Sequence, residues 1–212
     1  VCGDTKVVEK GKGDKLFINT TGIGVISRNR PLGMRSIKVG DKIIISGTIG
    51  DHGAAIMNER NNLCESSLLK SDCQSLNGII ESILNSSSEI KVMRDPTRGG
   101  VITTLLEIID ASNKEMLIYE DKLPISAEVS EFSDLLGLNP LYMANEGKII
   151  IIVSNQHAID VLNLLRNSQE GQEATIIGEV IADGKKNLYL ETTIGAKIKC
   201  FPMKGEQLPR IC

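Results

Sequence analysis

The chain has 212 residues, of which 41% are hydrophobic and 24% charged, so it can bury a core as one large domain or one domain with a piece of another. Its net charge is only −3 and its Lys and Arg residues are scattered, so the sequence does not favour a nucleic-acid partner. The longest apolar run, residues 149–153, is far shorter than the ~20 residues that span a bilayer, so no membrane partner is expected.

The cysteines and the first residues bear on the compartment. Five cysteines without a CxxC pair, together with two histidines, do not predict a structural zinc site. The chain starts without Met and without the regions of a signal peptide, and we expect it to begin inside a longer protein. Without a secretory context, we expect reduced thiols and a cytoplasmic location.

Chain order predicts three parts. Residues 1–34 are typical of a hairpin, with strands at 2–8 and 16–19, and hold too little apolar material for a core of their own. We interpret them as the remnant of a preceding domain. Residues 35–203 are expected to form the main domain, and the polar, aperiodic residues 204–212 a mobile tail.

Apolar spacing places the elements of the main domain. Residues spaced three and four apart predict helices at 54–60, 71–85, 100–111, 125–136 and 156–166. Apolar or alternating runs predict strands at 43–45, 115–119, 148–153, 174–180, 187–192 and 197–201. The two kinds do not alternate as a regular βαβ series, so the expected fold class is α+β, a layered sheet with covering helices.

The segment 94–100 (RDPTRGG) precedes a strong helical stripe. Thr97 is a candidate N-cap, and Gly99 and Gly100 leave backbone N–H groups uncovered beside Arg98. Such a helix start attracts phosphate or another anion. A capped helix with a solvated arginine explains the same residues equally well.

The segment 145–148 (NEGK) comes directly before the apolar strand at 149. A carboxylate in this position, Glu146, can act as a general base. On the residues alone, a turn with an exposed Glu–Lys pair is the stronger interpretation.

Two glycine-containing segments give weaker signals. Residues 3–6 (GDTK) offer Asp4 and Lys6 to magnesium or phosphate, but they lack the spacing of a Walker A loop. Residues 47–53 (GTIGDHG) lack the third glycine of a dinucleotide fingerprint and predict a strand-to-helix turn, with His52 in a capping or packing role.

The last residue is a cysteine, Cys212, at the end of the expected tail. A thiol on a flexible arm can travel between sites, which a core cysteine cannot do. It cannot belong to a CaaX lipidation box, because it is last rather than fourth from last. An incidental terminal cysteine remains an equal alternative on chemistry alone.

Six segments taken together resemble one protein family. They are 3–8 (GDTKVV), 20–24 (TTGIG), 46–55 (SGTIGDHGAA), 94–100 (RDPTRGG), 145–148 (NEGK) and 209–212 (PRIC). In this order they resemble the HypE family of hydrogenase maturation proteins, carbamoyl dehydratases of the aminoimidazole ribonucleotide synthetase superfamily. The DPTRGG-type motif is shared with relatives such as selenophosphate synthetase, whereas the ending is specific to this branch.

The resemblance implies a reaction and its residues. The thiol of Cys212 would accept a carbamoyl group from the carbamoyltransferase HypF. ATP would activate the carbamoyl oxygen, loss of water would leave a thiocyanate, and the cyanide would pass to iron on the HypC–HypD complex. Glu146 and Lys6 match positions that assist proton removal and nucleotide handling. Asp4 would contact the nucleotide and Mg²⁺, and residues 97–100 would lie on the nucleotide side.

The resemblance also implies what surrounds this chain. Full-length members carry an N-terminal nucleotide-binding domain, of which residues 1–34 would be the remnant, and pair through it as homodimers. The remaining residues would resemble the C-terminal domain of aminoimidazole ribonucleotide synthetase. For this chain alone a monomer is left open, and we expect it not to hydrolyse ATP.

Two other functions are compatible with the sequence. The chain could come from a relative that phosphorylates a small molecule, such as a selenophosphate or thiamine-phosphate enzyme, although those lack the terminal PRIC. Alternatively, it could act only as a carrier or docking module that presents Cys212 to its partners.

Overall fold

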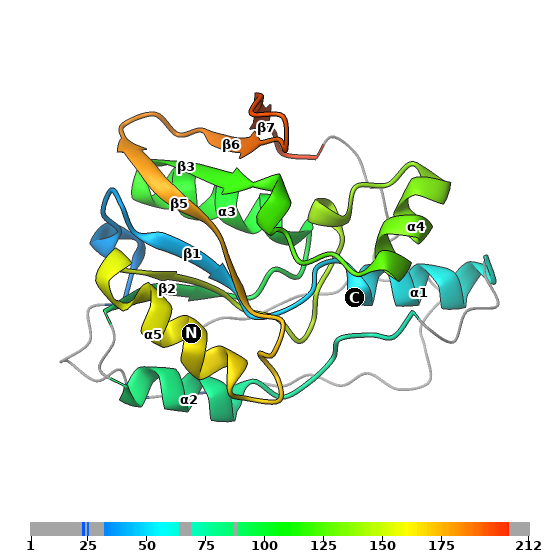
Figure 1. Ribbon diagram of the computed structural model, residues 1–212, viewed down its shortest axis with the longest axis horizontal. Helices are drawn as coiled ribbons and strands as arrows, with labels where there is room; N and C mark the ends of the chain where they lie inside the picture. Colours follow the sequence, from blue (N-terminus) through cyan, green and yellow to red (C-terminus); the bar gives the residue numbers. More distant parts are fainter. Residues whose placement is uncertain (1–22, 24, 26–31, 64–68, 87–88, 204–212) are drawn as a thin grey trace. The chain divides into compact units, whose positions relative to one another are not determined.

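The computed structural model describes residues 23, 25, 32–63, 69–86 and 89–203 (Figure 1). The chain divides into two units, Val1–Pro31 and Leu32–Cys212, and the described helices and strands all belong to the second. The strands expected at 2–8 and 16–19 and the tail at 204–212 lie outside the described residues, so the three-part organisation stays a prediction.

A seven-stranded mixed sheet forms the centre of the second unit, in the order β2–β4–β1–β5–β3–β6–β7. The β3–β6 pair is parallel, and the other described pairs are antiparallel. The strands are β1 (Lys42–Ile45), β2 (Ile90–Arg94), β3 (Lys114–Tyr119), β4 (Ile150–Val153), β5 (Thr175–Asp183), β6 (Leu188–Glu191) and β7 (Lys197–Cys200).

Helices lie on both faces of this sheet (Figure 1). The α-helices are α1 (Asp51–Asn61), α2 (Asn77–Asn85), α3 (Gly100–Ser112), α4 (Ala127–Leu136) and α5 (Ala158–Arg166). Single 3₁₀ turns are η1 (Met34–Ser36), η2 (Glu120–Lys122), η3 (Pro140–Tyr142) and η4 (Asn155–His157). The expected α+β class, a sheet covered by helices, is confirmed.

The strand β1 supplies core residues to both faces. Successive side chains of a strand point to opposite sides, so Ile43 and Ile45 pack with α3, whereas Ile44 packs with α2 and α5. All three are fully buried, and each such side chain stabilises the fold by roughly 1.5–3 kcal/mol. An apolar strand without alternation is therefore the signature of a sheet with two covered faces.

Beyond the sheet, α1 and α4 pack on each other around a third apolar cluster. The cluster contains Ala54 of α1, Val129 and Phe132 of α4, and Met143 from the segment after η3. The side chain of Ser126 caps α4 by accepting a hydrogen bond from the backbone N–H of Val129 at 3.3 Å. This packing holds the beginning of α1 beside the segments that form the site.

Two expectations for the elements are wrong in detail. The helix expected at 71–85 begins only at Asn77, because residues 71–74 bond to the segment at 146–147 instead. The strand β2 was not among those expected. Ile90, Lys91 and Val92 are all buried and the ladder with β4 has a register shift between Ile90 and Val92, so the two-residue period is lost.

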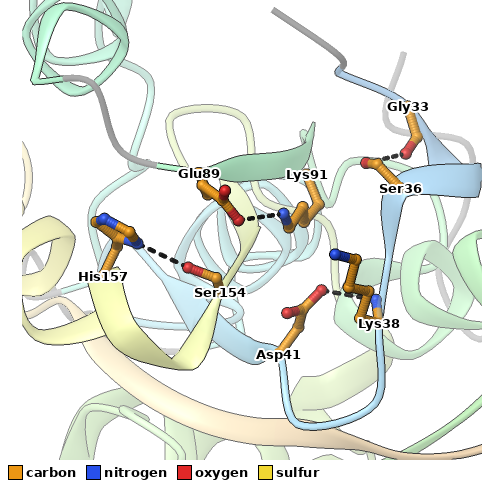
Figure 2. A network of polar contacts seen from close by, with 8 residues as sticks. All are labelled: Gly33, Ser36, Lys38, Asp41, Glu89, Lys91, Ser154 and His157. Atoms are coloured by element: carbon orange, nitrogen blue, oxygen red, sulfur yellow. Dashed lines mark hydrogen bonds and ion pairs between the residues drawn. The ribbon is translucent and has the colours of Figure 1, made fainter.

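A polar network lies where β2 begins (Figure 2). The ammonium of Lys91 donates a hydrogen bond to Glu89 at 2.8 Å, and this bond and its charge lower the pKa of the Glu89 carboxyl. Nearby, Asp41 accepts from the backbone N–H of Lys38 at 2.7 Å. The buried Lys91 is thus paired with an acidic residue, Glu89, that lies just before the strand.

Candidate functional site

The buried side chain of Asn145 joins three of the segments that the sequence singled out. Its Oδ1 accepts from the backbone N–H of Gly50 at 2.8 Å, at the start of α1. Its Nδ2 donates to the carbonyl oxygens of Pro96 at 3.1 Å and Met143 at 3.0 Å. The backbone N–H of Asn145 also bonds to Pro96, at 3.2 Å. The segments 46–55, 94–100 and 145–148 therefore meet at one residue.

The segment 94–100 forms a tight turn into α3. The N-cap of α3 is Gly99, with φ 71°, and not Thr97 as expected. Gly99 and Gly100 both have positive φ, which delays the helix, and the hydroxyl of Thr97 donates to Asp95 at 3.3 Å. Arg94 forms an exposed ion pair with Glu107 at 2.8 Å.

Gly100 marks a close approach between α3 and the residues of η3. A Cβ at this position would lie 2.5 Å from the carbonyl oxygen of Leu141 and 2.6 Å from that of Met143. Its N–H closes a turn to Thr97 O at 3.2 Å. No side chain caps α3, so the first-turn N–H groups have no side-chain partner of the kind that Thr97 was expected to provide.

Glu146 is held by its backbone against the segment 69–74. Its N–H donates to Oδ1 of Asp72 at 3.0 Å, and Gln74 donates to the carbonyl oxygen of Gly147 at 2.9 Å. A Cβ at Gly147 would collide with the carbonyl oxygen of Asp72. Only glycine permits this approach, which fixes the backbone that carries Glu146.

The interpretation of 145–148 as an exposed Glu–Lys pair is wrong. Lys148 is 8% exposed, Glu146 is half-buried, and the described contacts include no ion pair between them. Lys148 instead belongs to the wall of a cavity.

This cavity has a volume of about 310 Å³ and lies beside the start of α1. Its wall carries three carboxylates and two lysines from segments far apart in the sequence. The lining residues are Asp51, Leu69, Lys70, Ser71, Asp72, Ser126, Glu128, Val129 and Lys148.

The carboxyl of Asp51, which lines the cavity, has a shifted pKa. Burial raises its pKa, and the nearby charges of Asp72 and Glu128 act in the same direction. A hydrogen bond from Thr48 and the charge of Lys148 oppose this rise. The pKa of Asp51 is thus raised mainly because burial disfavours the charged carboxylate.

His52 follows Asp51 in the sequence and contacts the segment 69–74. It is buried, and its Nδ1 shares a hydrogen bond with the hydroxyl of Ser71 at 2.8 Å. The thiol of Cys73 lies 3.7 Å from the same nitrogen. The packing role expected for His52 agrees with this position.

Of the residues predicted to act, those at 97–100 and Glu146 are described and lie on neighbouring segments. Cys212, Lys6 and Asp4 lie outside the described residues. In the described part of the chain, no group of three or more His, Cys, Asp or Glu side chains could hold a metal ion. Among the same residues, no helix combines the length and apolar character that crossing a membrane requires.

The sequence analysis missed Asp51, Asp72 and Asn145 as site residues. Asp72 was assigned to a helix, although the run of polar residues at 70–75 lacks apolar periodicity and could have indicated a loop. The other two lay inside quoted motifs, and nothing in the sequence marks Asn145 as a fully buried residue or Asp51 as a residue of the cavity wall.

Comparison with known proteins identifies the family. The sequence profile of "AIR synthase related protein, C-terminal domain" matches residues 38–191, most of the chain. This chain belongs to the AIR synthase related family. Within that family it is 43% identical to carbamoyl dehydratase HypE of Bradyrhizobium diazoefficiens and 41% identical to that of Escherichia coli, each over 100% of this chain and 62% of the relative. The resemblance to HypE is thereby confirmed, and the chain spans about three fifths of the length of these relatives.

Solved structures agree with this assignment. This chain and the crystal structure of E. coli HypE superpose with a TM-score of 0.83 and 38% identity, over 89% of this chain and 58% of that one. A HypE structure in complex with ATP gives 0.79 at 37% identity, over 85% and 55%. Thiamine monophosphate kinase from Aquifex aeolicus, at 18% identity and a TM-score of 0.55 over 79% and 54%, shares the fold alone.

Proposed function

We propose that the protein carrying this chain is an ATP-dependent carbamoyl dehydratase that forms a thiocyanate on Cys212 and supplies the cyanide ligand of nickel–iron hydrogenase. The observation that carries the proposal is the meeting of segments 46–55, 94–100 and 145–148 at Asn145. Half of the segments on which the resemblance rests thus contact one buried residue, which supports a shared role for them. Similarity to carbamoyl dehydratases over the whole chain supports it.

The chemistry removes water from an S-bound carboxamide. Two N–H protons leave the nitrogen, the C–O bond breaks, and a C≡N group remains on sulfur. ATP, when bound, converts the carbonyl oxygen into a phosphate leaving group, so the products are ADP and phosphate. Glu146 is proposed as the base that takes a proton from nitrogen, on a backbone that Asp72 and Gly147 hold in place.

The described residues fit an anion at the start of α3. Its first turn has no side-chain cap, and Arg94 and Arg98 flank it. Residues 97–100 are therefore proposed to contribute to the nucleotide site. Lys6 and Asp4 are proposed to handle the nucleotide and Mg²⁺ from outside the described residues. Three carboxylates make the cavity beside Asp51 unsuited to bare phosphates.

The proposed partners follow from the relatives. A solved HypE–HypF complex, 38% identical and with a TM-score of 0.77 over 81% of this chain and 56% of that one, supports HypF as the carbamoyl donor. The HypC–HypD complex as acceptor, a homodimeric full-length protein and a cytoplasmic location remain parts of the same proposal.

Mass spectrometry tests the function in the full natural protein that carries this sequence. With carbamoyl phosphate, ATP and the carbamoyltransferase, Cys212 should gain a carbamoyl group and then lose one water. Cys212→Ala should abolish both changes. Glu146→Gln should permit the first and block the second, whereas Glu131→Gln, at an exposed position of α4, should permit both.

Three results would decide for other functions. A mass change that persists in Cys212→Ala would refute the assignment of the acceptor. Phosphorylation of an added small molecule instead of Cys212 would favour the kinase alternative, for which the fold likeness to thiamine monophosphate kinase is no specific support. Partner binding without loss of water would favour the carrier alternative.

A further inference from the structure

Asn145 is a buried amide whose donors are all used within the protein. The residue is 0% exposed. Its Oδ1 accepts from the N–H of Gly50, and its Nδ2 donates to the carbonyl oxygens of Pro96 and Met143. An Asn amide has two N–H donors, so this side chain has none left for a ligand. A role of Asn145 in the site must therefore act through the segments that it holds.

The carbonyl oxygen of Pro96 accepts twice from Asn145. The side-chain Nδ2 donates to it at 3.1 Å, and the backbone N–H donates to it at 3.2 Å. Pro96 lies three residues before Gly99, the N-cap of α3, and Glu146 directly follows Asn145. Consecutive Cα atoms are ~3.8 Å apart, so these two bonds connect the turn into α3 with the residue that carries the proposed base.

The start of α3 also rests directly on the segment that leads to Asn145. A Cβ at Gly100 would lie 2.5 Å from the carbonyl oxygen of Leu141 and 2.6 Å from that of Met143. Met143 provides one of the two carbonyl oxygens to which Asn145 donates. Close packing and hydrogen bonds thus fix the first turn of α3 relative to residues 141–145.

On its other side, the backbone of Glu146 is held by the segment 69–74. The N–H of Glu146 donates to Asp72 at 3.0 Å, and Gly147 lies so close to the carbonyl oxygen of Asp72 that no side chain fits there. The backbone of Glu146 therefore lies between this segment and the turn into α3. Asn145 supplies hydrogen bonds on the α3 side.

The proposed reaction depends on this spacing, because it requires two events on one carboxamide. The oxygen takes a phosphoryl group from ATP, and the nitrogen gives up its protons to a base. Oxygen and nitrogen are bonded to the same carbon, so the nucleotide side at residues 97–100 and the carboxylate of Glu146 must keep one separation. A misplacement of about 1 Å can slow such a step about 100-fold.

We infer that Asn145 is the positioning residue that fixes this separation and thereby couples the use of ATP to the loss of water. The inference rests on the proposed function. Without the Asn145 amide, the carboxamide oxygen still attacks the γ-phosphorus and ADP leaves, but proton removal by the displaced Glu146 is slow.

The phosphorylated carboxamide then has time to react with water. Water attacks the phosphorus, the bond between phosphorus and the carboxamide oxygen breaks, and the nitrogen regains any proton that it had lost. The carboxamide is restored and phosphate is released. The net reaction is hydrolysis of ATP to ADP and phosphate, without a thiocyanate.

The ratio of ADP to thiocyanate measures this coupling in the full natural protein. Cys212 is first carbamoylated, the protein is purified from the carbamoyltransferase and its nucleotides, and ATP is then added. Chromatography counts ADP, and mass spectrometry counts thiocyanate on Cys212. We expect a ratio of about one in the unsubstituted protein and about threefold more or higher in Asn145→Ala. The KM for ATP should change less than about threefold, because Asn145 bonds to carbonyl oxygens and not to the N–H groups of the α3 start.

A second variant and two controls separate positioning from stability. Asn145→Leu keeps the branched shape of the side chain and removes its hydrogen bonds, so it should raise the ratio as well. Asn139→Ala is the matched control, because Asn139 is exposed and accepts from Leu141 at 3.0 Å. Ile83→Val removes a buried methyl group from the cluster around α2 and α5 and lowers stability alone. Both controls should keep a ratio of about one.

Thermal melts establish which variants are folded. A ratio of about one in either folded Asn145 variant overturns the inference, however slow that variant is. A raised ratio in Ile83→Val overturns it too, because lowered stability would then suffice. Loss of the fold in both Asn145 variants would assign the residue to stability alone and has the same consequence.

The two proposals fail in different ways. If the unsubstituted protein converts carbamoylated Cys212 to thiocyanate but the Asn145 variants keep a ratio of about one, the inference is wrong and the function stands. If the unsubstituted protein forms no thiocyanate with ATP, the function is wrong and the inference falls with it.

Discussion

Asp51 and Lys148 line the same cavity and are electrostatically linked. The ammonium of Lys148 favours the ionised form of Asp51 and so limits the rise of its pKa. Replacing Lys148 by Met should therefore raise the pKa of Asp51 further. NMR titration of side-chain carboxyl carbons measures this shift. Lys70→Met is the matched control, and an equal rise in both variants would contradict the pairing.

The raised pKa of Asp51 also sets its contribution to stability. The folded state holds this proton more tightly than the unfolded state does. Its contribution is therefore fully present below the unfolded-state pKa and is lost as pH rises through the folded-state value. Ionisation of Asp51 is therefore less favourable in the folded state than in the unfolded state.

Glu179 shows the opposite sign. Hydrogen bonds from Lys42 at 2.5 Å and from Tyr119 at 2.6 Å lower the pKa of Glu179. The hydrogen bond between Tyr119 and Glu179 also raises the pKa of Tyr119 to about 12. The contribution of Glu179 is present above the unfolded-state pKa and is lost as pH falls through the folded-state value.

Glu179→Gln should consequently lower the free energy of unfolding by about 0.5–1 kcal/mol at neutral pH, since the group is only partly buried. The difference from the unsubstituted protein should shrink as the solution is acidified. Urea unfolding at a series of pH values measures it. Tyr119→Phe removes one of the two donors and should have a smaller effect; a constant difference at all pH values would refute the account.

The sequence motifs indicated which single residues matter, but not which residues they contact. Glu146 and the residues at 97–100 stood out because Gly and charged residues flank an apolar run. The assignment of Thr97 as N-cap failed because two consecutive glycines in the left-handed region move the helix start. The roles of Asn145 and Asp72 depend on contacts between segments 49 and 74 residues apart, which local spacing does not encode.

Among the elements, the junction of α3 with η3 tolerates no side chain at Gly100. Gly100→Ala should cost about 2–4 kcal/mol, because a left-handed φ and two carbonyl oxygens oppose its Cβ. Gly78→Ala is the matched control within α2, where nothing lies within 4 Å of the added methyl group, and it should stabilise by about 0.5–1 kcal/mol. Chemical denaturation of both variants measures the contrast, and similar values would contradict it.

Long amphipathic helices and apolar strands were predicted well from spacing. The helix expected at 100–111 matches α3, and the strand expected at 148–153 contains β4. Prediction failed where tertiary contacts compete with local pattern. Residues 71–74 lie before α2 because they bond to the segment at 146–147, and β2 lacks alternation because of its bulge.

For the molecule as a whole, the class of fold followed from sequence but the order of strands did not. A sheet with covering helices was expected from the mixed order of helices and strands, yet the neighbours of β4 are β2 and β1, strands that come much earlier in the chain. Such pairings depend on how complete layers fit together. No local signal distinguishes one neighbour from another.

The sheet should also open unevenly. β4 lies between two strands and is fully buried, whereas β7 has β6 as its one neighbour among the described strands and its side chains are largely exposed. We expect the amides of β4 to exchange with solvent only on global unfolding, and those of β7 through a local opening of lower free energy. Native-state hydrogen exchange in low denaturant measures both. Equal protection of the two strands would contradict this order.

The amide of Asn145 has a consequence for motion. One rigid, planar group is hydrogen-bonded to the turn before α1, to the turn before α3 and to the segment that follows η3. A displacement of any one of these three segments changes the hydrogen bonds that connect it to the other two. The turn before α1 and the loop bearing Arg98 are thereby joined through the side chain of one buried residue.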